Sequence, residues 1–542
     1  MIRTGFTQWL QKRRVERTPA DTELPLRAEL YGAEQLEAHA EALARNHVVE
    51  RRRTQDRLIA RLQDNAAALA AGHALLAGKL DEQRSVTPAG EWLLDNYHLI
   101  EQQIRVARRN LPKNYSAKLP WLANGPGRGL PRVYDLALAV IAHGDGRVDI
   151  DALGRVVMAY QRVDPLTLGE LWAVPIMLQL ALIENLRRVT DRLVASRRDR
   201  ELALRWAVRM LEVAEREPKG LILLVADMAR SEPRLSSAFV AEFARNLQGH
   251  RSGGTLPLSW LAQALAESGH TIEQLVEQES RLQAADQVSI GNSILTLGAL
   301  SALDWREFVE SVSVVEAVLA ADPHGSYRRM DFASRDHYRH VVEYLADHAG
   351  GDEPAVARAA LALAQDEAAR HGLMARTAHI GYWLVDRGRR QLEARLPLRL
   401  SPWLRLRQEL ARWPLTMYLG TATVTALLAT GAYASGLDAE GAAPGLLGLA
   451  LALAFIASSE LGVTLANWLA TLTVRPKPVP RLDYRHGIPP EARTLVAVPV
   501  LLGSAADIDT LVDALEVRYL ANRDPQLGFV LLSDLSDAAT ET

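Results

Sequence analysis

Two aspartates near the end of the sequence, Asp534 and Asp537, are the residues best placed to bind a ligand. They follow residues 528–532 (GFVLL), an apolar run typical of a buried β-strand. In doubly wound sheets, ligands bind beyond the carboxyl ends of the strands, where a carboxylate on rigid backbone can accept hydrogen bonds from a uracil imide or a ribose hydroxyl. The alternative is that Asp534 or Asp537 caps a following helix.

A strand–helix–strand unit must position these aspartates. Residues 494–502 (TLVAVPVLL) form a continuous apolar run rich in β-branched side chains, as expected for a strand buried on both faces. Residues 507–519 have the character of a helix, so the segment predicts one right-handed βαβ unit. Two strands cannot bury a sheet by themselves, so we expect residues 494–542 to be the beginning of an incomplete α/β domain.

Glu460 is the third residue of chemical interest, because it interrupts a long apolar segment, residues 441–474. A charge-free segment, residues 413–437, precedes it and would form a helix roughly 37 Å long, enough to cross a hydrocarbon core of about 30 Å. We therefore predict a hairpin of two transmembrane helices. Glu460 either lines a polar path for a glycan or an ion, or lies at an interface before a span that starts after it.

Charges on either side of the hairpin predict its orientation. Basic residues flank both outer ends, whereas the connecting turn carries only the acids Asp438 and Glu440. The basic residues before the hairpin are Arg399, Arg405, Arg407 and Arg412, and those after it are Arg475, Lys477 and Arg481. By the positive-inside rule, both flanks and therefore both termini are expected in the cytoplasm.

Most of the remaining sequence predicts helices. Residues 1–80 are expected to form a helical lead, and residues 81–400 an irregular all-α cytoplasmic domain. Within that domain, residues 201–217 show the period of an amphipathic helix, and the uncharged residues 171–183 predict a buried core helix. Residues 475–493 begin with alternating prolines and predict an extended linker.

Composition and motifs argue against several classes of function. The chain has no cysteine, which rules out disulfides, thiolate metal sites and cysteine nucleophiles. Its formal net charge of −3 argues against nucleic acid as a partner. Residues 125–129 (GPGRG) lack the preceding strand of a dinucleotide-binding loop, and residues 143–149 (HGDGRVD) lack the ligands of a calcium loop, so no metal site is predicted.

Several short motifs, taken together and in order, resemble the N-terminal region of bacterial cyclic β-1,2-glucan synthases. The resemblance covers the sequence from about residue 80 to its end. The motifs that carry it include residues 96–101 (NYHLIE), 131–134 (PRVY), 166–173 (LTLGELWA), 330–332 (MDF), 480–483 (PRLD), 487–489 (GIP), 515–518 (LEVR) and 521–525 (ANRDP).

The resemblance implies an enzyme of the bacterial inner membrane with a cytoplasmic, inverting GT-A glycosyltransferase module. Such a module extends β-1,2-glucan from UDP-glucose and uses a divalent metal, Mg²⁺ or Mn²⁺, in the complete domain. Asp534 falls where these enzymes place the nucleotide-contacting acid, and Asp537 is a weaker neighbour. The metal-binding Asp-x-Asp and the catalytic base belong beyond Thr542, so neither is assigned in this sequence.

The sequence therefore predicts a mainly α protein: an all-α cytoplasmic domain, a transmembrane hairpin and the first βαβ unit of a truncated GT-A domain. Its expected function is to anchor and regulate a cyclic β-1,2-glucan synthase, and the chain alone is expected to be inactive. The expected partners are inner-membrane lipids, the nucleotide sugar, the glucan and the C-terminal part of the same synthase. The alternative is a non-catalytic helical membrane scaffold with a vestigial glycosyltransferase start.

Overall fold

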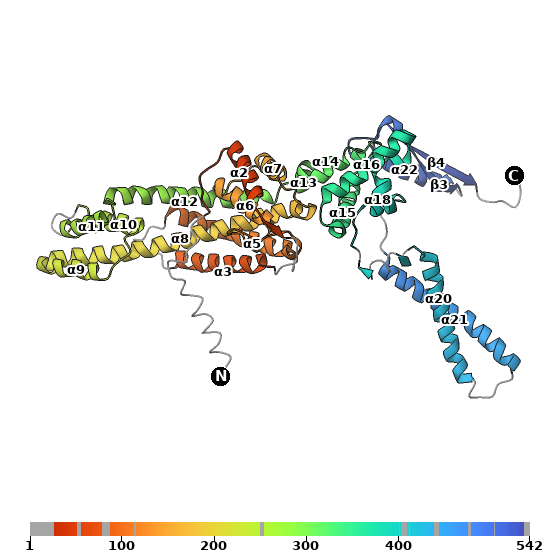
Figure 1. Cartoon of the computed structure of the whole chain (residues 1–542), viewed down its shortest axis with the longest axis horizontal. Coiled ribbons are helices and arrows are strands. Elements are labelled where there is room, and N and C mark those ends of the chain that lie inside the picture. The colour runs from red at the N-terminus through yellow and green to blue at the C-terminus, as the bar shows by residue number, and fades with distance from the viewer. Residues whose placement is uncertain are drawn as a thin grey trace. The chain divides into compact units, whose positions relative to one another are not determined.

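The computed structural model confirms the predicted fold class: the chain is mainly helical, with two helices long and apolar enough to cross a membrane and few strands among the described residues. It describes residues 26–50, 56–78, 87–112, 115–249, 254–399, 401–402, 409–410, 412–437, 444–474, 479–502 and 505–535. The chain divides into two compact units, Met1–Val314 and Val315–Thr542. Each unit is described separately below (Figure 1).

The first unit is built from helices and one short antiparallel strand pair. Its helices are α2 (Ala33–Asn46), α3 (Leu58–Ala77), α4 (Pro88–Asp95), α5 (Tyr97–Asn110), η2 (Ser116–Lys118), α6 (Arg132–His143), α7 (Ile150–Gln161), α8 (Leu168–Arg216), η3 (Pro218–Gly220), α9 (Leu221–Arg230), α10 (Ser237–Leu247), α11 (Thr255–Glu267), α12 (Ile272–Leu300) and α13 (Trp305–Val312). The strands β1 (Val49–Glu50) and β2 (Trp121–Leu122) pair with each other, an element that the sequence did not predict.

The 49-residue helix α8 organises the first unit. The expected core helix at residues 171–183 and the amphipathic helix at residues 201–217 both lie on it, although its last residue is Arg216. A capping box between Thr167 and Glu170 begins the helix, and Pro175 is tolerated inside it. The first half is buried almost all round, whereas in the second half the buried residues recur every three or four positions. α8 therefore contributes to two hydrophobic cores, one with α3 and α6 and one with α9 and α10.

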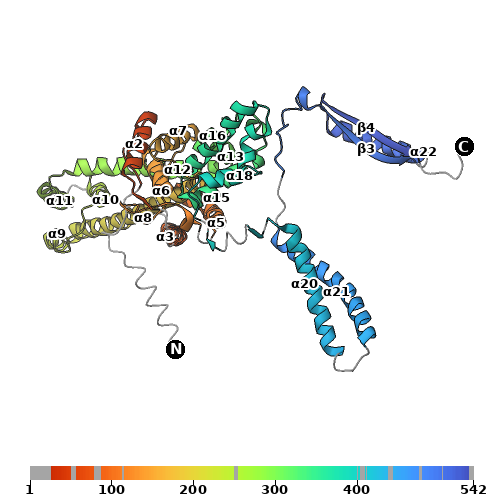
Figure 2. The same ribbon diagram turned by 45° about the vertical axis from the view of Figure 1, so that its right-hand side comes forward.

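The second unit contains a helical core, the hairpin and the βαβ segment. Its elements are α14 (Val314–Leu319), which begins at the boundary between the units, η4 (Tyr327–Arg329), α15 (Phe332–Ala349), α16 (Glu353–His371), η5 (Arg376–Ala378), α17 (Ile380–Leu384), α18 (Arg389–Arg395), α20 (Pro414–Leu437), α21 (Pro444–Thr473), η7 (Pro490–Ala492), β3 (Thr494–Leu502), α22 (Ala505–Ala521) and β4 (Leu527–Leu535). Figure 2 shows α20 and α21 side by side, and α22 alongside the two strands.

A buried ionic network fixes α3 and α6 to α8. The Glu184 carboxylate is fully buried and accepts hydrogen bonds from Arg61, from the Tyr134 hydroxyl at 2.9 Å and from Arg188 at 2.6 Å. Burial alone would raise the pKa of Glu184, but the hydrogen bonds from Arg61 and Arg188 outweigh it and lower the pKa to about 2. Such a network leaves an uncompensated buried charge when one partner is removed.

Replacing Glu184 therefore tests how much the first unit depends on this network. Glu184→Gln should lower the free energy of unfolding by about 3–5 kcal/mol, because Arg61 and Arg188 lose their counter-charge. The matched control Glu201→Gln, at a partly exposed i,i+4 pair on the same helix, should cost less than about 1 kcal/mol. Guanidinium unfolding of the detergent-solubilised chain, followed by tryptophan fluorescence, measures both.

The pH dependence of the same comparison provides a second check. The folded-state pKa of Glu184 is about 2 against 4.5 for a free carboxyl, so its stabilising contribution is complete above about pH 4.5. That contribution is lost as the pH falls towards 2. The stability difference between the native chain and Glu184→Gln should therefore shrink below pH 4.5, and a difference that does not depend on pH would contradict the ionic account.

Candidate functional site

The strand predicted at residues 528–532 is present as β4 (Leu527–Leu535), which continues three residues further than predicted. β3 and β4 pair in parallel from Thr494 opposite Leu527 to Leu502 opposite Leu535. Asp534 lies opposite Leu501, next to the last residue of β4, and its side chain is exposed. Because Asp534 is a strand residue followed by another strand residue, it is not the N-cap of a following helix. Asp537 lies outside the described residues.

Asp534 lies on a sheet face that is apolar and uncovered. Residues paired in a parallel ladder share a face, so Asp534 shares one with Leu501 and with the pairs two, four and six residues earlier. On this face the side chains of Leu495, Leu501 and Leu532 are 66%, 70% and 65% exposed. The alternate residues of β3 are partly covered, on the side where α22 packs. The open face is the kind of surface that further elements of an α/β domain bury.

Two of the sequence motifs, GIP at residues 487–489 and ANRDP at residues 521–525, are in contact beside β3 and β4. The Asp524 carboxylate accepts hydrogen bonds from the backbone N–H groups of Ile488 and Gln526, both at 2.8 Å. Gly487, just before Ile488, has a φ of +108°, a conformation that favours glycine. Asp524 therefore positions the chain that leads into β3 against the turn that leads into β4. The sequence contained both motifs but gave no indication that they are in contact.

The segment after the hairpin pairs with the helical core of the second unit. The backbone N–H of Asp331 donates to the carbonyl of Arg481 at 2.9 Å, and that of Asp483 donates to Arg329 at 2.7 Å. Between them, Met330 and Leu482 form an antiparallel bridge. The backbone N–H of Arg481 also donates to the Ser334 hydroxyl at 2.8 Å. We call this set of contacts the linker clamp.

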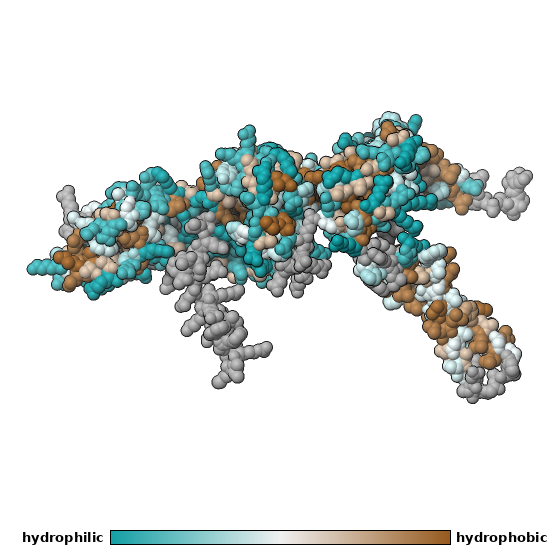
Figure 3. Space-filling model, in the orientation of Figure 1, coloured by the Kyte–Doolittle hydropathy of each residue, from teal (hydrophilic) through white to brown (hydrophobic). Residues whose placement is uncertain are grey.

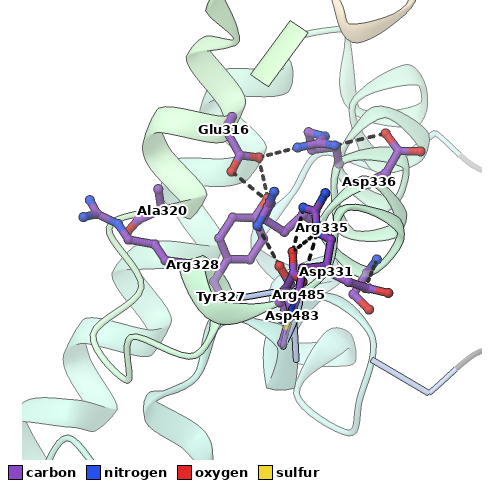
Figure 4. A network of polar contacts seen from close by, with 12 residues as sticks. Glu316, Ala320, Tyr327, Arg328, Asp331, Arg335, Asp336, Asp483 and Arg485 are labelled. Carbon is purple, nitrogen blue, oxygen red and sulfur yellow. Dashed lines mark hydrogen bonds and ion pairs between the residues drawn. The ribbon is translucent and has the colours of Figure 1, made fainter. Parts of the chain in front are cut away.

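A polar network supports the helical side of the linker clamp (Figure 4). Glu316 accepts hydrogen bonds from the Tyr327 hydroxyl at 2.7 Å and from Arg339 at 2.6 Å. Arg335 donates to the carbonyl of Met330 at 2.6 Å. Burial, together with the adjacent Glu316, raises the pKa of Tyr327, so this hydroxyl stays protonated. The network fixes η4 and the start of α15, which are the elements that hold the linker.

Asp322 joins the start of η4 to the start of α17. Its carboxylate accepts hydrogen bonds from His379 Nδ1 at 2.9 Å and from the backbone N–H groups of Ile380 at 2.9 Å and Tyr327 at 3.2 Å. Burial opposes the charge, but the hydrogen bond from His379 and those from the backbone lower the pKa of Asp322. Each contact satisfies the end of a helix or a ring nitrogen, so this buried carboxylate has a structural role.

The hairpin helices pack through small residues. Gly462 lies so close to the Ala422 carbonyl that an added Cβ would come within 2.3 Å of that oxygen. Ala426 and Ala466 are buried at the same contact, and the Tyr418 hydroxyl donates to the Asn467 amide oxygen at 3.0 Å. The outer surface is largely apolar, as Figure 3 shows, and the stretches Pro414–Gly436 and Gly445–Thr473 meet the length and hydropathy expected of membrane spans.

Glu460 lies well inside α21, and its side chain is exposed. Only residues 461–473 of the helix follow it, about 20 Å, which is less than the thickness of a hydrocarbon core. A span that begins after Glu460 would therefore be too short, and the structure favours Glu460 within the span. Among the described residues, no group of three His, Asp or Glu side chains could hold a metal ion.

These features define a class of protein: a mainly helical chain in which a hairpin of two apolar helices separates a helical core from a two-stranded parallel sheet with one helix. Over 489 residues the chain is 31% identical to the cyclic beta-(1,2)-glucan synthase NdvB of Rhizobium meliloti (strain 1021). The match covers 89% of this chain and 17% of that protein. No family model matches.

The similarity establishes a family-level relationship with the cyclic β-(1,2)-glucan synthases. It agrees with the resemblance that the sequence motifs carried. The relationship and the two apolar helices together indicate membrane association. The chain spans about a sixth of the length of the matched synthase.

The linker clamp offers a direct test. Ser334→Ala removes the acceptor for the Arg481 N–H, which should cost about 1 kcal/mol and speed local opening about fivefold. Hydrogen exchange of a peptide containing residues 481–485 measures the effect. The control Asp483→Asn alters the exposed side-chain pair with Arg485 but keeps the backbone donor, and should leave the exchange of Asp483 unchanged. Equal exchange in Ser334→Ala and the native chain would contradict the clamp.

Proposed function

We propose that this chain is the membrane-anchoring and regulatory part of a cyclic β-1,2-glucan synthase. In this proposal, residues 494–535 begin the module that takes glucose from UDP-glucose. The observation that carries the proposal is Asp534 at the carboxyl end of a parallel strand, on an uncovered apolar face, in a chain related to such synthases. A glucan synthase must bind an activated sugar donor, and strand ends of this kind are where α/β sheets bind nucleotides.

Asp534 has the chemistry to recognise the nucleotide of the donor. A carboxylate accepts hydrogen bonds only, so it suits the uracil imide or the ribose hydroxyls and not the diphosphate. Its position next to the last residue of β4 places it on backbone held by the ladder with β3. Asp524 has a positioning role, because it ties the entrance of β3 to the entrance of β4.

A divalent metal is expected in enzymes of this type, but the described residues do not fit one. They contain no group of three His, Asp or Glu side chains close enough to bind a metal. Asp534 is exposed on the sheet face among leucines and not in a cluster of acids. We therefore derive no step that uses a metal, and we assign this chain donor recognition and not the transfer itself.

The proposal also gives the hairpin a location and an orientation in the membrane. We propose the bacterial inner membrane as the location, with both flanks of the hairpin in the cytoplasm, because Arg412 and Arg481 flank the spans on that side. In this orientation the linker clamp and the βαβ unit face the compartment that contains nucleotide sugars. The helical core would then act on the transferase through the linker clamp, which holds residues 481–483, ahead of β3, against the core by backbone hydrogen bonds.

A chimera tests the proposal. This chain would replace the segment it matches in the Rhizobium synthase, and membranes containing the chimera would receive UDP-glucose with Mg²⁺ or Mn²⁺. We expect β-1,2-linked glucan from the chimera and none from this chain alone. Asp534→Ala should lower the apparent affinity for UDP-glucose about tenfold or more, the effect of losing hydrogen bonds to a charged group.

The matched control is Asp513→Ala, an exposed acid on α22. It should leave the affinity for UDP-glucose unchanged. An active chimera with unchanged affinity in Asp534→Ala would contradict the role of Asp534. A folded, membrane-inserted chimera that makes no glucan would favour the scaffold alternative over the synthase.

A further inference from the structure

One side of α21 carries a row of polar side chains, of which Asn467 also accepts a hydrogen bond from Tyr418 of α20. The row consists of Glu460, Thr464, Asn467 and Thr471. Spacings of four, three and four residues place these side chains on one side of a helix. All of them are exposed, whereas Gly462, about 200° of helical rotation after Glu460, is buried against α20. We call this row the polar face of α21.

A polar face directed at lipid is unfavourable, so it requires a partner within the membrane. An ionisable side chain inside a span normally faces protein or water, because hydrocarbon cannot solvate it. Neither α20 nor α21 contains a lysine, arginine or histidine, so the hairpin itself supplies no cation for Glu460. The close contact with α20 is made by Gly462 and other small residues, and on the polar face only Asn467 is hydrogen-bonded to α20, through Tyr418, while all four side chains stay exposed.

The hydrogen-bonding groups of the polar face complement one another. The hydroxyls of Thr464 and Thr471 donate to carbonyls of their own helix at 2.9 Å, and their oxygens can still accept. The Asn467 amide oxygen accepts from Tyr418, while its NH2 group can donate twice. The face therefore presents the donors and the acceptors that a copy of itself needs.

We propose that the polar face of α21 packs against the same face of α21 in a second copy of the chain, so that the hairpin dimerises within the membrane. Copies inserted in one orientation are related by a two-fold axis along the membrane normal, which brings identical residues together at equal depth. The Asn467 amides then donate to each other, and the two Glu460 side chains lie next to each other at the same depth. This contact covers every member of the row.

A different helix with a single basic residue would fit the face less well. Such a helix would neutralise Glu460, but it would not account for Asn467 and the threonines at the same helical spacing. Self-pairing uses all four positions with no additional chemistry. The proposal does not depend on Asp534 or on UDP-glucose, so it can fail while the proposed function stands.

The absence of cysteine from the native chain makes a direct test possible. Single variants Thr464→Cys and Thr471→Cys would be made in the full chain, in native membranes, and oxidised with copper phenanthroline. Both should form disulfide-linked dimers. The controls Leu461→Cys and Leu465→Cys are also exposed on α21 but lie off the polar face, Leu465 within one residue of Thr464 in depth, and should form few.

A second substitution distinguishes specific pairing of the two α21 helices from cross-links that form by random collision. Adding Glu460→Leu to Thr464→Cys should reduce the dimer about five- to thirtyfold at low expression, the range expected for losing an interhelical hydrogen bond in a membrane. Adding Glu460→Gln should preserve the dimer, because glutamine both donates and accepts. The proposal is overturned if the cysteines on the polar face form no dimer, if all positions cross-link equally, or if Glu460→Leu has no effect.

Discussion

The pairing of residues 329–331 with residues 481–483 is the contact on which the second unit depends. The chain leaves the helical core before α20 and returns after α21, so the hairpin lies between two segments that must find each other again. The linker clamp brings them together with backbone hydrogen bonds of 2.7–2.9 Å and one bridge between Met330 and Leu482. Backbone bonds of this kind fix both distance and direction, which a free proline-rich linker cannot do.

The buried carboxylates of the two units stabilise the helical fold. Glu184 in the first unit is surrounded by arginines and a tyrosine, and Asp322 in the second unit binds a histidine and two backbone N–H groups. Their hydrogen-bonding capacity is used within the fold. Asp534 differs from both, because it is exposed at a strand end beside uncovered leucines. Burial thus distinguishes the acids that stabilise the helices from Asp534, whose side chain reaches the surface.

Much of the local structure could be predicted from the sequence because its causes are local. The apolar run at residues 494–502 is β3 with the same bounds, and the charge-free run before the turn is α20. The bounds of β4 differ: the sequence indicated a strand ending at Leu532, but the ladder with β3 continues to Leu535 and includes Asp534. Polar residues are tolerated there because the strand end is exposed, which hydropathy alone does not reveal.

Hydropathy, periodicity and turn residues predicted the hairpin of apolar helices, the helical character and the βαβ order, because each of these signals acts within a few residues of chain. Tertiary structure alone decided which distant segments meet: Ser334 with Arg481, Asp524 with Ile488, and the single helix α8 shared by two cores. In the first two contacts, a side-chain oxygen of Ser334 or Asp524 accepts from a distant backbone N–H group. Nearly every residue carries such a donor, so the sequence does not mark which one is bound, and only the packed fold selects it.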